Sequence, residues 1–514
     1  MAKSGTVYLV GAGPGDAGLL TLRGAELLRR ADVVVYDVLV NPELLRLAPA
    51  GAELISRGSR GSGEAMSQEA LNALMVAKAH AGKCVVRLKG GDPYIFGRGG
   101  EEAEALADAK VPFEVVPGVS SIVAAPNYAG IPLTHREHCS SFTVLTGHEG
   151  VGGEEGHFDL DQIARIPGTK VILMGLRKLP ELTEGLIARG MAAETPVAVV
   201  HWGTTGRQQS VAGTLASIAG LAAGKGFSPP ALTVIGDVVK LREKLNWFER
   251  RPLFGRRVVV TRSRPQAAEL TDRLTELGAE VLEIPCIKIG PPTQLAHVAD
   301  VLLALNSYDW LVFTSPNGVT AFFDLFFKAF KDTRDIGGVR IAAVGPGTAA
   351  RLRDLHLQVD LMPEEAIGAK IAKAFDAYET IENLKICLLR AEVANPDLPK
   401  ALEARGAIVD DIACYKTIAE TEDHTGDAAR LLESGADWIT FTSASTVEHF
   451  HARFDLPALL KRFPQAKLAS IGPETSKALA ELALQPSVEA RQHTIEGLVA
   501  AVLRRQSSGQ QGQT

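Results

Sequence analysis

The sequence predicts an α/β protein with more than one domain. Short β-branched runs, such as residues 7–10 and 33–36, alternate with stretches rich in Ala, Leu and Glu, as in the βαβ units of parallel sheets. The chain has 514 residues, of which 46% are hydrophobic. It is too long for one ordinary domain and can bury several cores. Pro252 and Gly255, between a helical pattern and a new strand, indicate a linker.

We therefore predict domains over residues 1–250 and 251–505, followed by a disordered tail over 506–514 that is rich in Gln, Ser and Gly. The net charge of −6 gives no attraction for nucleic acid. The five cysteines lack Cys-x-x-Cys spacing, no apolar stretch reaches about 18 residues, and the first residues do not resemble a signal peptide. We expect a reduced, cytoplasmic protein with no nucleic-acid or membrane partner.

The second predicted domain contains an internal duplication at an offset of 128 residues. The aligned pairs include Arg262 with Arg390, Trp310 with Trp438, and Phe313-Thr314-Ser315 with Phe441-Thr442-Ser443. A pattern common to all α/β units is the alternative, but a shared Trp and Phe-Thr-Ser at one spacing favours duplication. Two similar halves imply a cleft between them in which a ligand binds.

A glycine loop, Gly-Ala-Gly-Pro-Gly-Asp at 11–16, follows the first strand, and Asp37 follows the next. This spacing resembles a dinucleotide-binding fingerprint. However, Pro14 removes an N–H from the turn, and Asp16 places negative charge where a phosphate would bind. The loop therefore fits a ligand without phosphates. A nicotinamide cofactor and a purely structural turn are the alternatives.

A second glycine loop, Gly90-Gly91-Asp92, ends another strand. The glycines allow close backbone approach, and Asp92 can accept hydrogen bonds from a ligand. Basic residues recur beside these loops. They are Arg57, Arg60, Arg87, Lys89, Arg98 and Arg136. As a set they are typical of carboxylate receptors, although a solvated surface is the alternative for each one alone.

These motifs, together with residues 130–136 and 230–236, resemble uroporphyrinogen III C-methyltransferases over about residues 5–247. The resemblance implies a two-lobed tetrapyrrole-methylase fold, S-adenosylmethionine as methyl donor, no metal, a homodimer, and Asp37 as general base. It also implies a set of cofactor-binding residues: Pro14, Gly90, Gly91, Asp92, Ile95, Ser120, Ser121, Met174, Gly203 and Ala231. Where the family has Gly-Lys-Arg, this chain has Ser59 in place of the lysine, so no lysine proton donor is present there.

The implied chemistry fits the residues. A pyrrole carbon is a nucleophile and a sulfonium methyl group is already activated, so positioning supplies much of the acceleration. The proton that leaves afterwards can go to the Asp37 carboxylate, directly or through water. The histidines form no His-Glu-x-x-His pattern and none is paired with cysteine at ligand spacing, so no metal is expected.

The second domain resembles uroporphyrinogen III synthases over about residues 256–503. The resemblance implies two lobes joined by crossing strands near residues 290 and 418, with the first lobe built from both ends of the domain and with no cofactor. Groups after the strands are expected to bind the substrate's acetates and propionates. The predicted residues are Arg262, Thr314, Ser315, Thr348, Arg390, Thr442, Ser443 and Thr475. For each Thr-Ser pair the alternative is a helix N-cap.

Tyr415 is the predicted catalytic residue of this domain. It aligns with Ile287, whereas the flanking Cys286 and Lys288 match their counterparts. A phenol can donate a proton to a departing hydroxyl, as loss of water from hydroxymethylbilane requires, and the family's candidate acid is a tyrosine at this place. A half-buried strand residue is the alternative.

Together these interpretations predict an enzyme that converts hydroxymethylbilane to uroporphyrinogen III, with inversion of ring D and loss of water, and then methylates this product twice to give precorrin-2. Two other functions stay open. The first domain could methylate another corrinoid intermediate, and the second could be a non-catalytic two-lobe binding module.

Overall fold

A computed structural model describes residues 5–58, 66–147, 159–364, 368–423 and 425–510. The chain forms two compact units. The first comprises Met1–Arg257 with Thr275–Glu280, and the second Val258–Leu274 with Val281–Thr514. The predicted linker at Pro252 and Gly255 lies just before the change from one unit to the other at Arg257.

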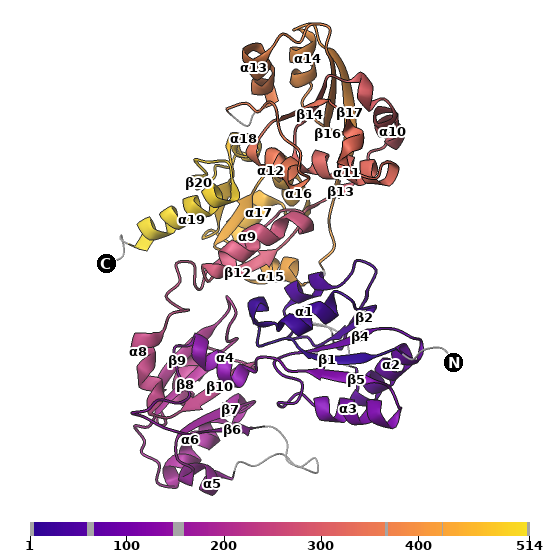
Figure 1. Cartoon of the computed structure of the whole chain (residues 1–514). Helices are drawn as coiled ribbons and strands as arrows, with labels where there is room; N and C mark the ends of the chain where they lie inside the picture. Colours follow the sequence, from indigo (N-terminus) through magenta and orange to yellow (C-terminus); the bar gives the residue numbers. More distant parts are fainter. Residues whose placement is uncertain (1–4, 59–65, 148–158, 365–367, 424, 511–514) are drawn as a thin grey trace. The chain divides into compact units, whose positions relative to one another are not determined.

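The first lobe of unit 1 is a parallel sheet in the order β3-β2-β4-β1-β5. Its strands are β1 (Val7–Gly11), β2 (Val33–Tyr36), β3 (Glu53–Ser56), β4 (Val85–Lys89) and β5 (Phe113–Val116). Helix α1 (Leu22–Leu28) packs on one face, and α2 (Gln68–His80) and α3 (Gly99–Asp108) pack on the other (Figure 1). Because the strands are parallel, the glycine loops and Asp37 lie at the same edge of the sheet.

The second lobe of unit 1 is a mixed sheet in the order β6-β7-β10-β8-β9. Its strands are β6 (Phe142–Thr146), β7 (Thr169–Leu173), β8 (Pro196–His201), β9 (Gln209–Thr214) and β10 (Ala231–Ile235). The helices are α4 (Ser121–Tyr128), α5 (Leu160–Arg165), α6 (Leu179–Ala188), α7 (Ile218–Gly224) and α8 (Arg242–Leu245). Helix α4 follows the first sheet in sequence but buries Ile122 and Ala125 against the second sheet. The predicted two-lobed architecture is confirmed.

Unit 2 also contains two sheets, in the orders β12-β11-β18-β19-β20 and β13-β17-β16-β14-β15. The strands of the first are β11 (Arg257–Val260), β12 (Glu280–Glu283), β18 (Trp438–Phe441), β19 (Lys467–Ser470) and β20 (Val488–Glu489). Those of the second are β13 (Ile287–Gly290), β14 (Trp310–Phe313), β15 (Arg340–Ala343), β16 (Lys385–Ala391) and β17 (Ile408–Ala419). The helices are α9 (Arg264–Glu276), α10 (Leu295–Leu303), α11 (Pro316–Ala329), α12 (Pro346–Asp354), α13 (Gly368–Tyr378), α14 (Asp397–Glu403), α15 (Asp427–Ser434), α16 (Ala444–Phe454), α17 (Leu456–Arg462), α18 (Pro473–Glu481) and α19 (Ile495–Gln510).

The strand orders confirm the duplication. The order β12-β11-β18-β19 in one sheet repeats as β17-β16-β14-β15 in the other. Trp310 and Trp438 begin equivalent strands, and both are fully buried. The first sheet takes strands from both ends of the unit, and β13 pairs antiparallel with residues 416–419 of β17. Both crossings therefore lie where the sequence predicted them.

The C-terminal helix extends farther than expected. Helix α19 continues to Gln510, so residues 506–510 of the predicted disordered tail are helical, while 511–514 lie outside the described residues. The helix buries Leu498 and Val502, and one turn later Gln506 is also buried. Packing of the helix therefore outweighs the polar composition of this segment.

Candidate active sites

The glycine loops after β1, β4 and β5 are in direct contact. Ala12 N–H donates to the Lys89 carbonyl at 2.7 Å, and Gly91 N–H donates to the Gly13 carbonyl at 2.7 Å. A Cβ atom on Gly118 would lie 2.2 Å from the Gly91 carbonyl oxygen. This approach is closer than real side chains tolerate, so the loops can pack together only because glycine occupies such positions.

Asp92 connects two of these loops. Its Oδ2 accepts a hydrogen bond from Gly118 N–H at 3.0 Å, and its Oδ1 accepts one from Tyr94 N–H at 2.8 Å. Each bond uses one lone pair of an oxygen that has two, so the half-buried carboxylate keeps acceptor capacity for a ligand.

The predicted cofactor residues come from both lobes of unit 1. Those of the second lobe, Met174, Gly203 and Ala231, gather at one sheet edge because β10 starts where β7 and β8 end. In the first lobe, a Cβ atom added to Gly91 would lie within 3.9 Å of Ser120 Cα and Ser121 N, so these loops are neighbours. Residues of the two lobes also approach each other. A Cβ atom added to Gly15, the residue after Pro14, would lie 3.5 Å from the Gly203 carbonyl oxygen. Ile95 is exposed at the loop surface.

Asp16 joins the two lobes of unit 1. Its Oδ2 accepts a hydrogen bond from the Tyr128 hydroxyl at 2.7 Å, and its backbone N–H donates to Thr204 Oγ1 at 3.2 Å. Burial and the hydrogen bond to Asp16 raise the pKa of Tyr128, so its phenol stays protonated. Roles for Tyr128 and Thr204 were not predicted, because they depend on contacts with Asp16 over more than a hundred residues.

A buried chain of charges ends at Asp37. Arg87 is fully buried and donates from Nη2 to Asp37 Oδ1 at 2.6 Å. The same nitrogen lies 3.2 Å from Glu102 Oε1, which also accepts a hydrogen bond from Lys89 Nζ at 2.8 Å. Burial and the neighbouring Arg87 charge lower the pKa of Lys89, whereas Glu102 opposes this shift. We call Asp37, Arg87, Glu102 and Lys89 the charge chain; Asp37 is its only partly exposed member.

The burial of Arg87 and Lys89 differs from the expectation that both contact a substrate carboxylate, because their cationic groups face Glu102. Glu102 was not predicted. A signal for it existed, since Arg87 and Lys89 are two residues apart on the central strand β4 and therefore point to the same face of the sheet, toward α3. Two buried cations on one face require an anion.

The other predicted basic residues are nearer the surface. Arg57 donates to Gln68 Oε1 at 3.1 Å and has Nη1 4.0 Å from Asp37 Oδ1. Arg98 is half exposed and pairs with Glu101, and Arg136 is exposed. Arg60 and Ser59 lie outside the described residues.

In unit 2, Tyr415 is a buried side chain whose hydroxyl has polar neighbours. It is 7% exposed, and its hydroxyl lies 2.9 Å from Ser315 Oγ. Burial raises the pKa of Tyr415, and hydrogen bonds to Ser315 and Asn317 act in the opposite direction. The residue is therefore both a packed strand residue and a protonated phenol held between hydroxyl and amide groups.

The predicted Thr and Ser residues follow strands, as expected, and the two serines cap helices. Ser315 Oγ accepts from Gly318 N–H at 3.1 Å, and Ser443 Oγ accepts from Thr446 N–H at 3.3 Å. The four predicted threonines follow strands and are half-buried or buried. They are Thr314 and Thr442, which are half-buried, and Thr348 and Thr475, which are buried in the first turns of α12 and α18. Of the two predicted arginines, Arg390 pairs with Asp411, whereas no ion pair of Arg262 is found among the described residues.

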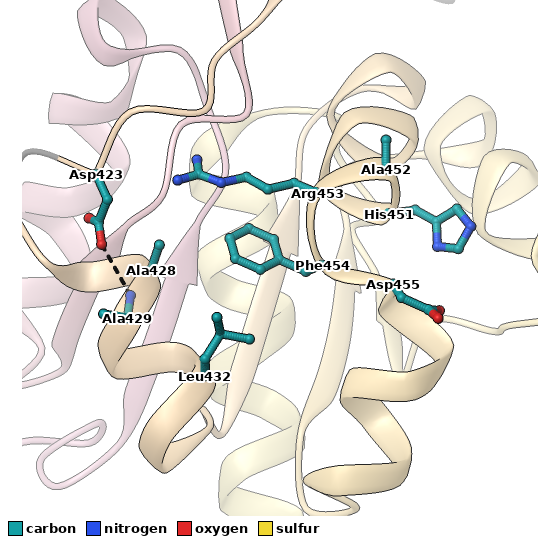
Figure 2. A pocket seen from close by; sticks show the side chains of 9 residues that line it. All are labelled: Asp423, Ala428, Ala429, Leu432, His451, Ala452, Arg453, Phe454 and Asp455. Atoms are coloured by element: carbon teal, nitrogen blue, oxygen red, sulfur yellow. Dashed lines mark hydrogen bonds between the residues drawn. The ribbon is translucent and has the colours of Figure 1, made fainter.

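A surface pocket in unit 2 lies between α15 and α16 (Figure 2). It contains none of the predicted site residues. Its charged groups bind the protein itself, because Arg453 donates to the backbone carbonyls of Glu420 and Thr421, and Asp423 accepts from Ala429 N–H at 3.1 Å. In the part of the chain that the structure describes, no three His, Cys, Asp or Glu side chains gather as a metal site, and no helix is long and apolar enough to cross a membrane.

Fold and sites together define an α/β enzyme with two separate functional units. The family model for tetrapyrrole (corrin/porphyrin) methylases matches residues 6–219, and that for uroporphyrinogen-III synthase HemD matches residues 268–500. The chain belongs to the tetrapyrrole methylases in its first unit and to the uroporphyrinogen-III synthases in its second, and it is an enzyme with one domain of each kind.

Two relatives of similar sequence agree with this assignment. A porphyrin biosynthesis protein HemD of Ruminiclostridium josui is 38% identical over 98% of both chains. A uroporphyrinogen-III C-methyltransferase of Bacillus subtilis (strain 168) is 41% identical over 75% of this chain and 79% of its own length. Among solved structures, a uroporphyrin III C-methyl transferase from Thermus thermophilus is 40% identical, covering 46% of this chain and 94% of that one, with a TM-score of 0.40.

Proposed function

We propose that this enzyme carries out two consecutive steps of tetrapyrrole synthesis. Its second unit closes hydroxymethylbilane to uroporphyrinogen III with inversion of ring D and loss of water, and its first unit methylates that product twice to give precorrin-2. The observation that carries the methylation step is the position of Asp37, held by Arg87 at the sheet edge where the glycine loops meet. The relatives named for uroporphyrinogen III support this substrate.

In the first unit, S-adenosylmethionine would lie across the two lobes, against the glycine loops and the edge formed by Met174, Gly203 and Ala231. A bond forms between a pyrrole carbon and the methyl group while the carbon–sulfur bond breaks, releasing S-adenosylhomocysteine. Asp37 then accepts the proton that the tetrapyrrole loses after methylation, directly or through water. Among the described residues predicted to bind substrate, Arg57, Arg98 and Arg136 are the cations nearest the surface, whereas Arg87 holds Asp37 from the interior and Lys89 pairs with Glu102.

In the second unit, Tyr415 would protonate the departing hydroxyl of hydroxymethylbilane. Its raised pKa keeps the phenol protonated at neutral pH, and Ser315 can accept or return a proton at 2.9 Å. Thr, Ser and backbone amide groups after the strands would bind acetate and propionate groups. We further propose a cytoplasmic homodimer that assembles through the methyltransferase unit.

The test is incubation of the purified chain with hydroxymethylbilane and S-adenosylmethionine, followed by isomer analysis and mass spectrometry. We expect the type III isomer and addition of two methyl groups. Formation of the type I isomer alone would contradict the synthase assignment. Failure to methylate supplied uroporphyrinogen III, with methylation of another tetrapyrrole, would favour a different corrinoid substrate.

A further inference from the structure

Two arginines at equivalent positions of the duplicated unit have unequal surroundings. Arg390, on β16, is 7% exposed and donates from Nε to Asp411 Oδ1 at 2.6 Å. A second hydrogen bond joins the same two side chains, and Arg390 Nη1 donates to the Asn395 carbonyl at 2.6 Å. The charge of Arg390 is therefore neutralised within the folded protein.

Arg262, the equivalent residue after β11, has no such partner. No ion pair of Arg262 is found among the described residues, and its buried Nε has no hydrogen-bond acceptor. Its Nη2 reaches only Gln266 Oε1, at 3.5 Å. Burial lowers the pKa of Arg262, and the more distant carboxylate of Glu269, which forms no ion pair with it, acts in the opposite direction. A buried donor without an acceptor lowers the stability of the folded protein, which points to a ligand that supplies the acceptor when it binds.

The carboxylate that could neutralise Arg262 is engaged elsewhere. The residue equivalent to Asp411 is Glu283 on β12, at the same offset of 128. Glu283 Oε1 accepts a hydrogen bond from Thr271 Oγ1 at 2.5 Å. The residue equivalent to Thr271 in the other half is Pro399, which has no hydroxyl. The two halves therefore differ in what binds the carboxylate: Asp411 binds Arg390, whereas Glu283 binds Thr271 and Arg262 forms no ion pair among the described residues.

Arg262 lies beside residues predicted to bind substrate. Strands β11 and β18 are parallel neighbours, and Thr261 Oγ1 donates to the Thr440 carbonyl at 2.8 Å. The residues that follow these strands, Arg262 and Thr442, therefore share the carboxyl edge of the sheet, where ligands of open α/β sheets bind.

A polar connection runs from Arg262 to Tyr415. Gln266, the neighbour of Arg262, donates from Nε2 to Asn317 Oδ1 at 2.6 Å, which joins α9 of one lobe to α11 of the other. Asn317 is in turn near enough to the Tyr415 hydroxyl to act on it, since its side chain lowers the pKa of this phenol. Arg262 thus faces the region between the lobes of unit 2, two side chains from the proposed acid.

We propose that Arg262 binds an acetate or propionate carboxylate of the linear tetrapyrrole, with Gln266 and Asn317 fixing this carboxylate relative to Tyr415, while Arg390 is a structural residue. The proposal rests on the synthase activity proposed above. A half-buried guanidinium whose buried Nε has no acceptor is suited to a carboxylate, which it can bind through two hydrogen bonds.

The test compares Arg262→Gln with Arg390→Gln, and uses Arg334→Gln on the exposed surface as a control for loss of one charge. In the full-length enzyme, Arg262→Gln should raise KM for hydroxymethylbilane about 10- to 100-fold, as expected for loss of a charged hydrogen bond. Its Tm should not fall. Arg390→Gln should lower Tm, because it leaves the Asp411 carboxylate without its partner. Arg334→Gln should change neither quantity.

An Arg262→Gln enzyme with unchanged KM, or with a lowered Tm and unchanged KM, would overturn the proposal. If this variant does not fold, Arg262→Met serves as the second test, since it keeps the aliphatic stem and removes the charge; an unchanged KM there would also overturn it. Arg262→Lys should restore part of the affinity. A wild-type enzyme that forms no uroporphyrinogen III would instead refute the synthase function itself.

Discussion

The charge chain of unit 1 allows a quantitative prediction for Glu102→Gln. Glu102 is fully buried, and its Oε1 accepts hydrogen bonds from Arg87, Lys89 and Gln68. The substitution keeps the shape of the side chain. It leaves the buried cations Arg87 and Lys89 with Asp37 as the one remaining anion of the charge chain. Removing one partner of a buried ion pair costs about 3–5 kcal/mol. We expect a loss of this size in the unfolding free energy of unit 1.

A double variant separates charge from packing. Adding Lys89→Met to Glu102→Gln removes one cation as well as one anion, so the remaining Asp37–Arg87 pair is balanced. Coupled neighbours typically show interaction free energies of about 0.5–3 kcal/mol, and we expect the double variant to recover about 2 kcal/mol. Denaturant unfolding monitored on the transition of unit 1 measures both values. A double variant as unstable as the sum of the single variants would refute the charge-balance argument.

Four further predictions concern the two activities. Asp37→Asn should retain S-adenosylmethionine binding, measured by calorimetry, and slow methyl transfer about 10²-fold or more, because an amide cannot take the proton; normal turnover would exclude Asp37 as the base. Asp92→Ala should weaken cofactor binding without changing synthase rate, since it frees the Gly118 and Tyr94 amides; equal loss of both activities in a folded variant would contradict separate sites. Tyr415→Phe should lower uroporphyrinogen III formation about 10²-fold or more and leave methylation of supplied uroporphyrinogen III unchanged; a wild-type synthase rate would return Tyr415 to a packing role. Sedimentation should show a dimer, and a species of only 54.6 kDa at micromolar concentration would contradict it.

Much of the fold could be predicted because its signals are local. Runs such as residues 33–36 fit a buried parallel strand, and the glycine loops after them locate the sheet edge. The duplication predicted that Trp310 and Trp438 lie in equivalent strands, and they do. The helical extent of residues 506–510 could not be predicted, because composition alone does not reveal that α19 packs against the unit.

The candidate sites were less predictable, because burial and pairing depend on distant contacts. Basic residues beside glycine loops were interpreted as receptors for anions, but Arg87 and Lys89 point into the core. That interpretation assumed that residues next to a glycine loop are accessible, whereas both lie in the five-residue strand β4, all of which is buried. A strand in the centre of a parallel sheet has no solvent-facing side.

Comparison of the two halves of unit 2 provides information that a single half does not. Duplicated halves begin with the same side chains and the same strand contacts, so a residue needed only for folding should keep the same partner in both. Arg390 and Arg262 do not, since Arg390 is bound by Asp411, whereas Arg262 has a buried Nε without an acceptor and no ion pair among the described residues. Tyr415 and Ile287 differ in the same way, because only the tyrosine places a hydroxyl next to Ser315. Arg262 and Tyr415 come from different halves, and Gln266 and Asn317, which are hydrogen-bonded to each other, lie between them. One substrate that carries both a carboxylate and a departing hydroxyl would satisfy both groups at once.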